Sequence, residues 1–123
     1  MSDQPLRTRL QVKGTRRLAV VDAPEGIDDL IGAGDARAEL ENADVVVQFT
    51  RDRHEFEIAV VNILRAARPI AILWVAYPKL TSRFASDLNR DVIRSLAPGY
   101  GLDSVSQIAI DADWSALRLK RSS

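Results

Sequence analysis

The sequence predicts an α/β domain with three layers, built on a mostly parallel five-stranded sheet. Short apolar runs alternate along the chain with segments whose apolar residues recur at helical spacing. Such alternation is typical of parallel strands joined by helical crossovers. The most continuous apolar run is residues 70–79, IAILWVAYPK, which Pro69 precedes and Pro78 closes. Because an uninterrupted apolar strand is covered on both faces, this run is predicted to be the central strand.

The first strand is expected at residues 18–21, LAVV, because this run is short, apolar and followed by turn residues. The turn, 22–26, contains a proline without a backbone donor and a glycine that tolerates unusual backbone angles. A short helix is expected over 27–31. Its inner face is expected to carry Ile27, Leu30 and Ile31. Residues 35–42 fit either a helical turn or a short edge strand, and the pattern leaves both open.

The second strand is expected at residues 44–50, DVVVQFT, because three valines and a phenylalanine favour a buried parallel strand. The clearest helix follows over 52–67, where Asp52 and Glu55 stand at capping-box spacing. One face of this helix collects its apolar residues. They are Phe56, Val60, Ile63 and Ala67.

A second good helix is expected over 87–96, with Ser86 as its N-cap. Its core stripe would be Leu88, Val92 and Leu96. The last two strands are expected at 104–110 and 114–120. They form an antiparallel hairpin, because only a short polar turn separates them.

The composition is that of one compact domain with a sizeable core, since the chain has 123 residues and is 46% hydrophobic. The formal net charge is +0, which gives no overall attraction to nucleic acid or to an anionic membrane. There is no cysteine and one histidine, His54, so thiol chemistry and the common zinc sites are excluded and no metal is expected. No apolar run approaches the roughly 20 residues of a membrane helix, and no signal peptide is recognisable. A cytoplasmic location is therefore expected.

Residues 1–14 are polar and basic, and they are expected to form a flexible arm beside a single α/β domain over 15–123. Three apolar residues in the arm suggest that it touches something. They are Leu6, Leu10 and Val12. The basic residues of this region suit weak contact with phosphates. They are Arg7, Arg9, Lys13, Arg16 and Arg17.

The second half of the chain resembles the second half of a class I methyltransferase-like Rossmann fold. The resemblance runs through VVVQFT, ILWVAYPK, GLDSVSQIAID and WSALRLK. It implies the strand order 1-2-3-5-4, with the last strand antiparallel. Three shorter pieces, AVVDAPEG, YPK and WSALRLK, resemble an uncharacterised family of small bacterial proteins of unknown function, and together they cover most of residues 17–120.

The chain departs from methyltransferases at the turn after the first strand. Methyltransferases carry a glycine-rich cofactor loop there, whereas residues 22–26 read DAPEG. Two further strands of the larger fold, one of which normally carries an acidic ribose ligand, do not fit in this length. Methyltransferase activity is therefore not expected, and no cofactor is assigned. The missing strands would leave the strand at 18–21 as an apolar sheet edge, which residues 35–42, the N-terminal arm or a second copy of the chain would cover. A homodimer or higher oligomer is expected.

The candidate ligand site lies where the parallel strands end, because open parallel sheets bind ligands at their carboxyl ends. The polar residues there have both charges, and a helix N-terminus beside Lys79 or Arg83 suits an anionic small molecule. The candidate ligand-binding residues are Asp22, Glu25, Thr50, Tyr77, Lys79, Asp87 and Arg90. Lys79, which follows an apolar strand and a rigid proline, is the sharpest candidate. The alternative is that these residues serve only as loop residues and caps, with Lys79 paired to an acid.

Three classes of function remain open. The first is an oligomeric binding or interaction protein without catalysis. The second is a small-molecule or nucleotide-binding enzyme whose site lies near Lys79, although no catalytic residue can be named from the sequence. The third is a weak nucleic-acid binder that uses the basic N-terminal residues, which lack the interleaved aromatic residues of common nucleic-acid modules.

Overall fold

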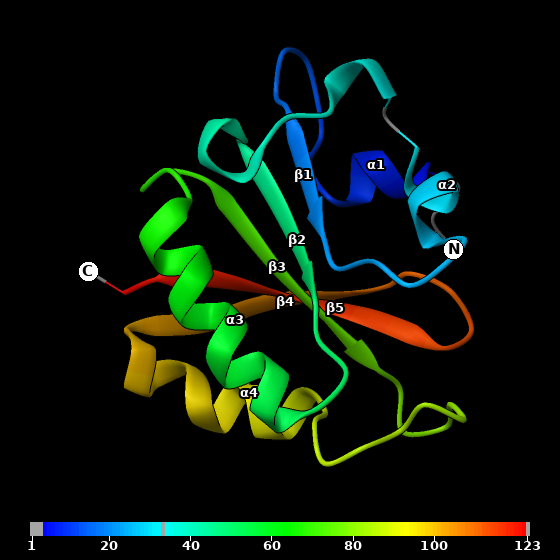
Figure 1. Cartoon of the computed structure of the whole chain (residues 1–123), viewed down its shortest axis with the longest axis vertical. Helices are drawn as coiled ribbons and strands as arrows, with labels where there is room; N and C mark the ends of the chain where they lie inside the picture. The colour runs from blue at the N-terminus through cyan, green and yellow to red at the C-terminus, as the bar shows by residue number, and fades with distance from the viewer. Residues whose placement is uncertain (1–3, 33, 123) are drawn as a thin grey trace.

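The computed structural model describes residues 4–32 and 34–122, and within them a five-stranded sheet has the order β1-β2-β3-β5-β4 (Figure 1). The strands are β1 (Leu18–Val21), β2 (Val45–Phe49), β3 (Ile72–Pro78), β4 (Leu102–Ala109) and β5 (Trp114–Arg121). β1, β2 and β3 are parallel, and β5 runs antiparallel to both β3 and β4. The predicted sheet, its order and its antiparallel last strand are confirmed.

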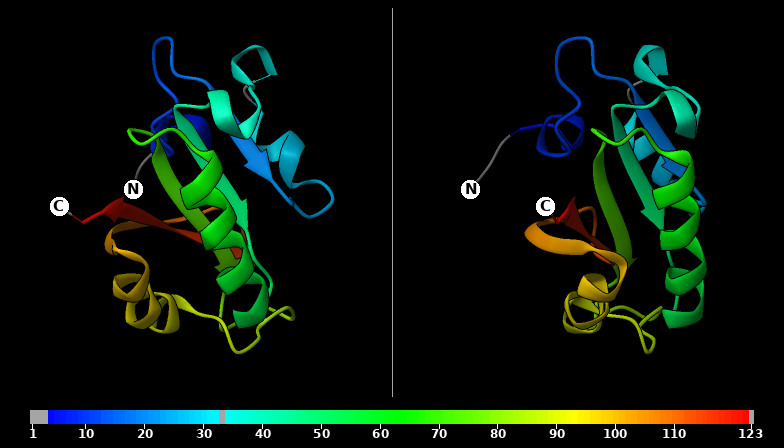
Figure 2. Two further views of the ribbon diagram at one scale, coloured as in Figure 1. Left: turned by 60° about the vertical axis from the view of Figure 1, so that its left-hand side comes forward. Right: turned by 90° about the vertical axis from the view of Figure 1, so that its left-hand side faces the viewer.

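Helices cover both faces of the sheet, which makes the three predicted layers (Figure 2). The helices are α1 (Leu6–Arg9), α2 (Ile27–Ile31), α3 (Arg53–Ala66) and α4 (Arg90–Leu96), with short 3-10 turns η1 (Gly34–Ala36), η2 (Leu40–Asn42) and η3 (Ala97–Tyr100). Side chains of β3 alternate between the layers, as the period of a strand requires. Trp74 and Ala76 pack with α1 and α2, whereas Val75 and Tyr77 pack with α3 and α4.

The long helix α3 begins where its sequence predicts. The Asp52 carboxylate accepts a hydrogen bond of 2.8 Å from the Glu55 backbone N–H, which satisfies one free donor of the first turn. The Glu55 carboxylate reaches one residue further back than in a standard capping box and accepts from the Arg51 backbone N–H at 2.9 Å. The helix ends before Pro69, and its buried face contains the predicted Phe56 and Val60.

The helix α4 is shorter than predicted and starts at Arg90 rather than near residue 87. Its N-cap is Asn89, whose side chain accepts a hydrogen bond of 3.1 Å from the Val92 backbone N–H. Ser86, the predicted cap, instead donates its hydroxyl hydrogen to the Arg51 carbonyl at 2.7 Å. The loop before α4 therefore turns towards the start of α3, and this long-range contact cannot be read from local spacing.

The N-terminal segment packs on its own domain, in contrast to the expected flexible arm. Helix α1 buries Leu6, and Leu10 and Val12 are buried in the same apolar cluster as Trp74. The indole N–H of Trp74 donates a 3.0 Å hydrogen bond to the Leu10 carbonyl. Leu6 and Leu10 have the four-residue spacing of one helical face, and the basic residues between them mask this pattern. Residues 1–3 of the expected arm lie outside the described residues.

The open choice over residues 35–42 resolves into the two 3-10 turns η1 and η2 beside the edge strand β1. The Ala38 backbone N–H donates to the Leu18 carbonyl at 2.9 Å, and Arg37 forms an isolated bridge with Leu18. The edge of β1 is thus partly covered from within the chain. Nearby, α2 has its predicted bounds, but Leu30 is exposed and does not share the inner face with Ile27.

Candidate functional site

The seven predicted ligand-binding residues do not form one site. Tyr77, Lys79 and Arg90 line one cavity, and Asp22 and Glu25 line another. The remaining two residues line neither of these cavities. The ends of neighbouring strands lie together in a topology diagram. In this structure the twist of the sheet and the loop after β3 separate them.

Thr50 and Asp87 have structural partners. Thr50 is fully buried, and its hydroxyl donates to the Ala76 carbonyl of β3 at 2.8 Å. The Asp87 carboxylate accepts a 2.9 Å hydrogen bond from the Arg53 backbone N–H at the start of α3. Its negative charge at a helix N-terminus also favours α3 electrostatically.

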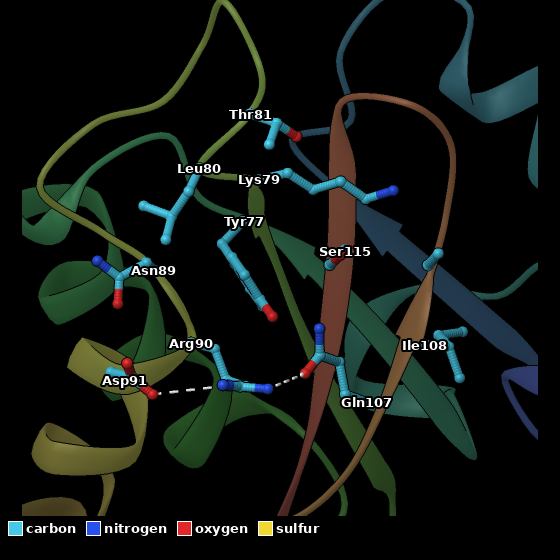
Figure 3. Close-up of a pocket in the computed structure, with 11 residues that line it drawn as sticks. Tyr77, Lys79, Leu80, Thr81, Asn89, Arg90, Asp91, Gln107, Ile108 and Ser115 are labelled. Atoms are coloured by element: carbon cyan, nitrogen blue, oxygen red, sulfur yellow. Dashed lines mark hydrogen bonds and ion pairs between the residues drawn. The ribbon is translucent and has the colours of Figure 1, made fainter.

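The first cavity, called the Tyr77 cavity here, has a volume of about 510 Å³ and lies between the end of β3, the start of α4 and the β4–β5 hairpin (Figure 3). This size is within the usual range for small-molecule sites. Its lining is Tyr77, Lys79, Leu80, Thr81, Asn89, Arg90, Asp91, Gln107, Ile108, Ala109 and Ser115.

Tyr77 stands at the inner end of this cavity and is only 3% exposed. Its hydroxyl is buried, and it has no hydrogen-bond partner among residues 4–32 and 34–122. Ser115 is its cross-strand neighbour in the β3–β5 register and is also buried. Burial raises the pKa of Tyr77 above its ordinary 10.0, although the Arg90 charge and Ser115 oppose this rise. A hydrogen-bonding contact with the Ser115 side chain lowers this pKa, so Ser115 is close to the Tyr77 hydroxyl, although the pair falls outside the distance and angle limits of a hydrogen bond.

The charge of the Tyr77 cavity is positive in balance. Lys79 and Arg90 contribute two positive charges and Asp91 one negative charge. The Arg90 Nη1 donates to the Gln107 amide oxygen at 3.4 Å, and its Nε lies 3.6 Å from the Asp91 carboxylate. Lys79 is partly exposed, and its ammonium has no hydrogen bond or ion pair within the described part of the chain. The cavity therefore attracts anions.

The second cavity, called the Asp22 cavity here, has a volume of about 830 Å³ and lies at the ends of β1 and β2. The buried Gln48 side chain donates its amide hydrogens to the Asp22 carboxylate and to the Phe49 carbonyl, each at 2.9 Å. Asp22 has a φ of 59°, a left-handed conformation that is uncommon for a residue other than glycine. On the other side, the rings of Phe84 and Trp114 stack at 6.1 Å.

The remaining charges of the Asp22 cavity satisfy one another in part. Arg51 forms an i,i+4 ion pair of 3.1 Å with Glu55, and this hydrogen-bonded carboxylate raises the pKa of the Arg51 guanidinium. Glu25 lines the same cavity. The buried polar side chain of the Asp22 cavity, Gln48, thus has its partners. Among the described residues, no buried side-chain donor of this cavity is left without a hydrogen bond.

Sequence reasoning missed the contribution of the C-terminal hairpin to the Tyr77 cavity. Ser115 and Gln107 come from β5 and β4, and Asn89 from the start of α4. A signal was present, because an antiparallel strand inserted beside β3 must place one of its first residues opposite Tyr77. Ser is the residue at that position in WSALRLK, and a small polar residue in an apolar strand is unusual.

The described residues contain neither a grouping that would hold a metal ion nor a helix that could cross a membrane. Within residues 4–32 and 34–122, no three histidine, cysteine or acidic side chains are grouped so that they would hold a metal ion. The described helices are all too short or too polar to cross a membrane.

Comparison with known proteins places the fold. No protein-family model matches the sequence, and no curated protein matches it. Among solved structures, the chain is similar to the crystal structure of ribosomal protein L11 methylase from Lactobacillus delbrueckii subsp. bulgaricus, with a TM-score of 0.52 and 11% identity. The alignment covers 92% of this chain and 61% of that chain. The protein thus has a methyltransferase-like α/β fold, and it spans less than two thirds of that structure's length.

Proposed function

We propose that this protein binds a small anionic molecule in the Tyr77 cavity, and that binding without chemistry is its function. The observation that carries the proposal is the buried, unpartnered hydroxyl of Tyr77. A buried hydroxyl without a partner costs about 1–3 kcal/mol of folding free energy. Phenylalanine would avoid this cost with the same ring, so the hydroxyl is best explained by a partner that arrives with a ligand.

The charge of the cavity supports an anion. Lys79 and Arg90 outnumber Asp91, and the Asp91 carboxylate is largely exposed to solvent, where its field is screened. No acid forms an ion pair with Lys79 within the described residues, and both of the acids proposed from sequence, Asp22 and Asp87, bind elsewhere. The ammonium is thus available to a ligand.

Methyltransferase activity is not proposed, in spite of the fold. The turn after β1 reads DAPEG where a glycine-rich cofactor loop would stand.

An enzyme with its site at the Tyr77 cavity is the alternative function. A tyrosine whose pKa is raised stays protonated at neutral pH, as a proton donor must, but no nucleophile-and-base pair is assigned beside it.

A thermal-shift screen with small anions tests the proposed function. At about 100 times its Kd, a ligand should stabilise the protein by about 2.7 kcal/mol and raise its Tm by several degrees. Lys79→Ala should reduce this shift, because the ligand loses one positive charge near it. Lys120→Ala, which removes an exposed lysine on the same sheet, is the control and should leave the shift unchanged.

Two results of this screen would oppose the proposal. In one, no anion of a broad panel of carboxylates, phosphates and nucleotides shifts the Tm. In the other, the shift is the same in Lys79→Ala as in the wild type.

We also propose that the protein is a homo-oligomer in the cytoplasm. The apolar side chains of Ile58, which is 60% exposed, and of Val61 lie on the outer surface of α3 and support a contact with a second copy. Light scattering at tens of micromolar should give at least twice the monomer mass. A monomer mass under these conditions would refute this proposal.

Membership in the uncharacterised bacterial family is proposed from the DAPEG, YPK and WSALR motifs.

Weak nucleic-acid binding is the third proposed function, and the contacts of Arg16 and Arg17 are relevant to it. Both guanidinium groups donate to carbonyl groups of their own chain, at 3.1 and 2.6 Å, so these two residues are partly engaged. A steep salt dependence of oligonucleotide binding would support this third proposal.

A further inference from the structure

The Arg90 side chain uses little of its hydrogen-bonding capacity. A guanidinium has five N–H donors in a planar fork. Within the described residues, those of Arg90 make one hydrogen bond of 3.4 Å to Gln107 and one ion pair of 3.6 Å to Asp91. Both contacts are at the long end of their ranges and therefore weak. Most of the fork is available to a ligand that enters the Tyr77 cavity.

Hydroxyl donors line the cavity beside Arg90. In Figure 3 the Tyr77 hydroxyl points between Ser115 and the Arg90–Gln107 hydrogen bond. The Tyr77 phenol is protonated at neutral pH, as any tyrosine is, and burial raises its pKa further, so it can donate. A fork of N–H groups and a neutral hydroxyl donor next to it require a ligand group that accepts several hydrogen bonds at once. Such a group replaces the weak bond between Arg90 and Gln107.

The geometry favours a planar acceptor over a tetrahedral phosphate. Proteins usually hold phosphates with backbone N–H groups of a helix N-terminus or a glycine-rich loop. Here Asn89 caps the start of α4 with its own side chain, and α4 is only seven residues long. None of the residues that line the cavity is a glycine. The guanidinium fork forms two parallel hydrogen bonds with either a carboxylate or a phosphate. Together with the Tyr77 hydroxyl it satisfies the two oxygens of a carboxylate, whereas the additional oxygens of a phosphate would lack donors from these two groups.

The rest of the cavity is suited to an apolar body. Leu80 is 71% exposed at the cavity mouth, and Ala109 of β4, the neighbour of Ser115, lies on the same face of the sheet. A hydrocarbon group that covers these side chains would remove apolar surface from water. Such a body attached to a carboxylate would fill the space between Leu80 and the Arg90 fork.

We infer that the ligand of the Tyr77 cavity is a compact carboxylic acid with an apolar body. Its carboxylate binds the Arg90 guanidinium and accepts a hydrogen bond from Tyr77, and its body lies against Leu80 and Ala109. This inference rests on the proposed anion-binding function and narrows it to one class of ligand.

Matched probes separate the carboxylate from other head groups. Two series are used, one with a benzyl and one with an isobutyl body, each as the carboxylate, the primary amide and the phosphonate. Isothermal titration calorimetry on the whole chain should detect the carboxylate in at least one series. The amide and the phosphonate of that series should bind at least tenfold more weakly, because the amide loses the charge and the phosphonate buries an oxygen that the fork and the Tyr77 hydroxyl leave without a donor.

Two arginines of α4 provide a matched pair of variants. Arg90→Lys keeps the charge but removes the fork, and it should weaken carboxylate binding about tenfold or more. Arg94→Lys changes an exposed arginine one turn along α4, outside the Tyr77 cavity, and it should change the affinity less than twofold. Arg90 is itself largely exposed, so Arg90→Lys should fold normally, which circular dichroism verifies.

The outcomes distinguish this inference from the proposed function. If a phosphonate binds as tightly as its carboxylate, or if Arg90→Lys binds the carboxylate as the wild type does, the inference is wrong while anion binding stands. If no carboxylate in either series binds, the inference is also wrong. If, in addition, the broad anion screen is negative, the proposed function fails as well.

Discussion

Replacing Leu10 with alanine is expected to lower the free energy of unfolding by about 3 kcal/mol. Leu10 is 0% exposed and packs in the apolar cluster that contains Trp74. Truncation of a buried leucine removes apolar contacts and leaves a cavity, which costs about 2–5 kcal/mol in a well-packed core. Urea unfolding, followed by circular dichroism, measures the change.

The control for Leu10→Ala is Arg7→Ala, which removes an exposed side chain from the same helix α1. This variant should change the unfolding free energy by less than about 0.5 kcal/mol. If Leu10→Ala and Arg7→Ala have equally small effects, the segment is a mobile arm after all and its packing on Trp74 does not persist in solution.

Replacing Tyr77 with phenylalanine is expected to have opposite effects on stability and binding. The free energy of unfolding should rise by about 1 kcal/mol, because the variant no longer buries an unpaired hydroxyl. Binding of the anionic ligand should weaken about tenfold, because its head group loses one hydrogen bond to the protein. Urea unfolding and calorimetric titration measure the two changes.

Tyr100→Phe is the matched control for Tyr77→Phe. Tyr100 packs edge-on against Phe56 and does not line the Tyr77 cavity, so its variant should leave ligand affinity unchanged. If Tyr77→Phe lowers the stability by 1 kcal/mol or more, the hydroxyl has a stabilising partner in the free protein. The argument for a ligand would then lose its main support.

The same variant should alter the response to alkaline pH. Burial raises the pKa of Tyr77 in the folded state above 10.0, so the unfolded chain releases this proton first as the pH rises. The wild-type free energy of unfolding therefore keeps its full value below about pH 10 and falls as the pH rises through the folded-state pKa of Tyr77. The Tyr77→Phe variant has no such proton to release, so its free energy of unfolding does not fall for this reason. The stability difference between variant and wild type should therefore be larger at about pH 11 than at about pH 9, and an equal difference would contradict the pKa shift.

The arrangement of the sheet could be predicted from the sequence because it depends on patterns that are local. The apolar runs around Val46 and Val75 and the helical stripe with Phe56 and Val60 lie in single elements, and each is buried as the pattern requires. The insertion of the last strand between β3 and β4 came from a resemblance to a known fold rather than from residue spacing.

The parts that sequence reasoning missed depend on contacts between distant residues. Ser86 was a good local cap for α4, but it binds the Arg51 carbonyl, and Asn89 takes its place. Leu10 looked like part of a basic arm until the Trp74 indole was placed against its carbonyl. Both errors arise because a local sequence preference stabilises a structure less than one buried hydrogen bond between distant residues does.

Residues of the one site predicted from the sequence are divided between two cavities in the structure. Tyr77, Lys79 and Arg90 do share a cavity, whereas Asp22 lies in a different one. The sequence indicates at which end of a strand a side chain emerges. It does not indicate how far the twist of the sheet and the loop after β3 separate neighbouring strand ends.

The position of β5 between β3 and β4 also constrains how the chain acquires its structure during synthesis. The ribosome makes β4 first, yet β4 pairs only with β5 and therefore cannot join the sheet until Trp114–Arg121 has been made. Until then one edge of β3 stays unpaired, and Tyr77 lacks its neighbour Ser115. The nascent chain thus carries an exposed apolar strand edge until β5 has been made, and such an edge favours aggregation. The Tyr77 cavity is completed only when β5 pairs with β3.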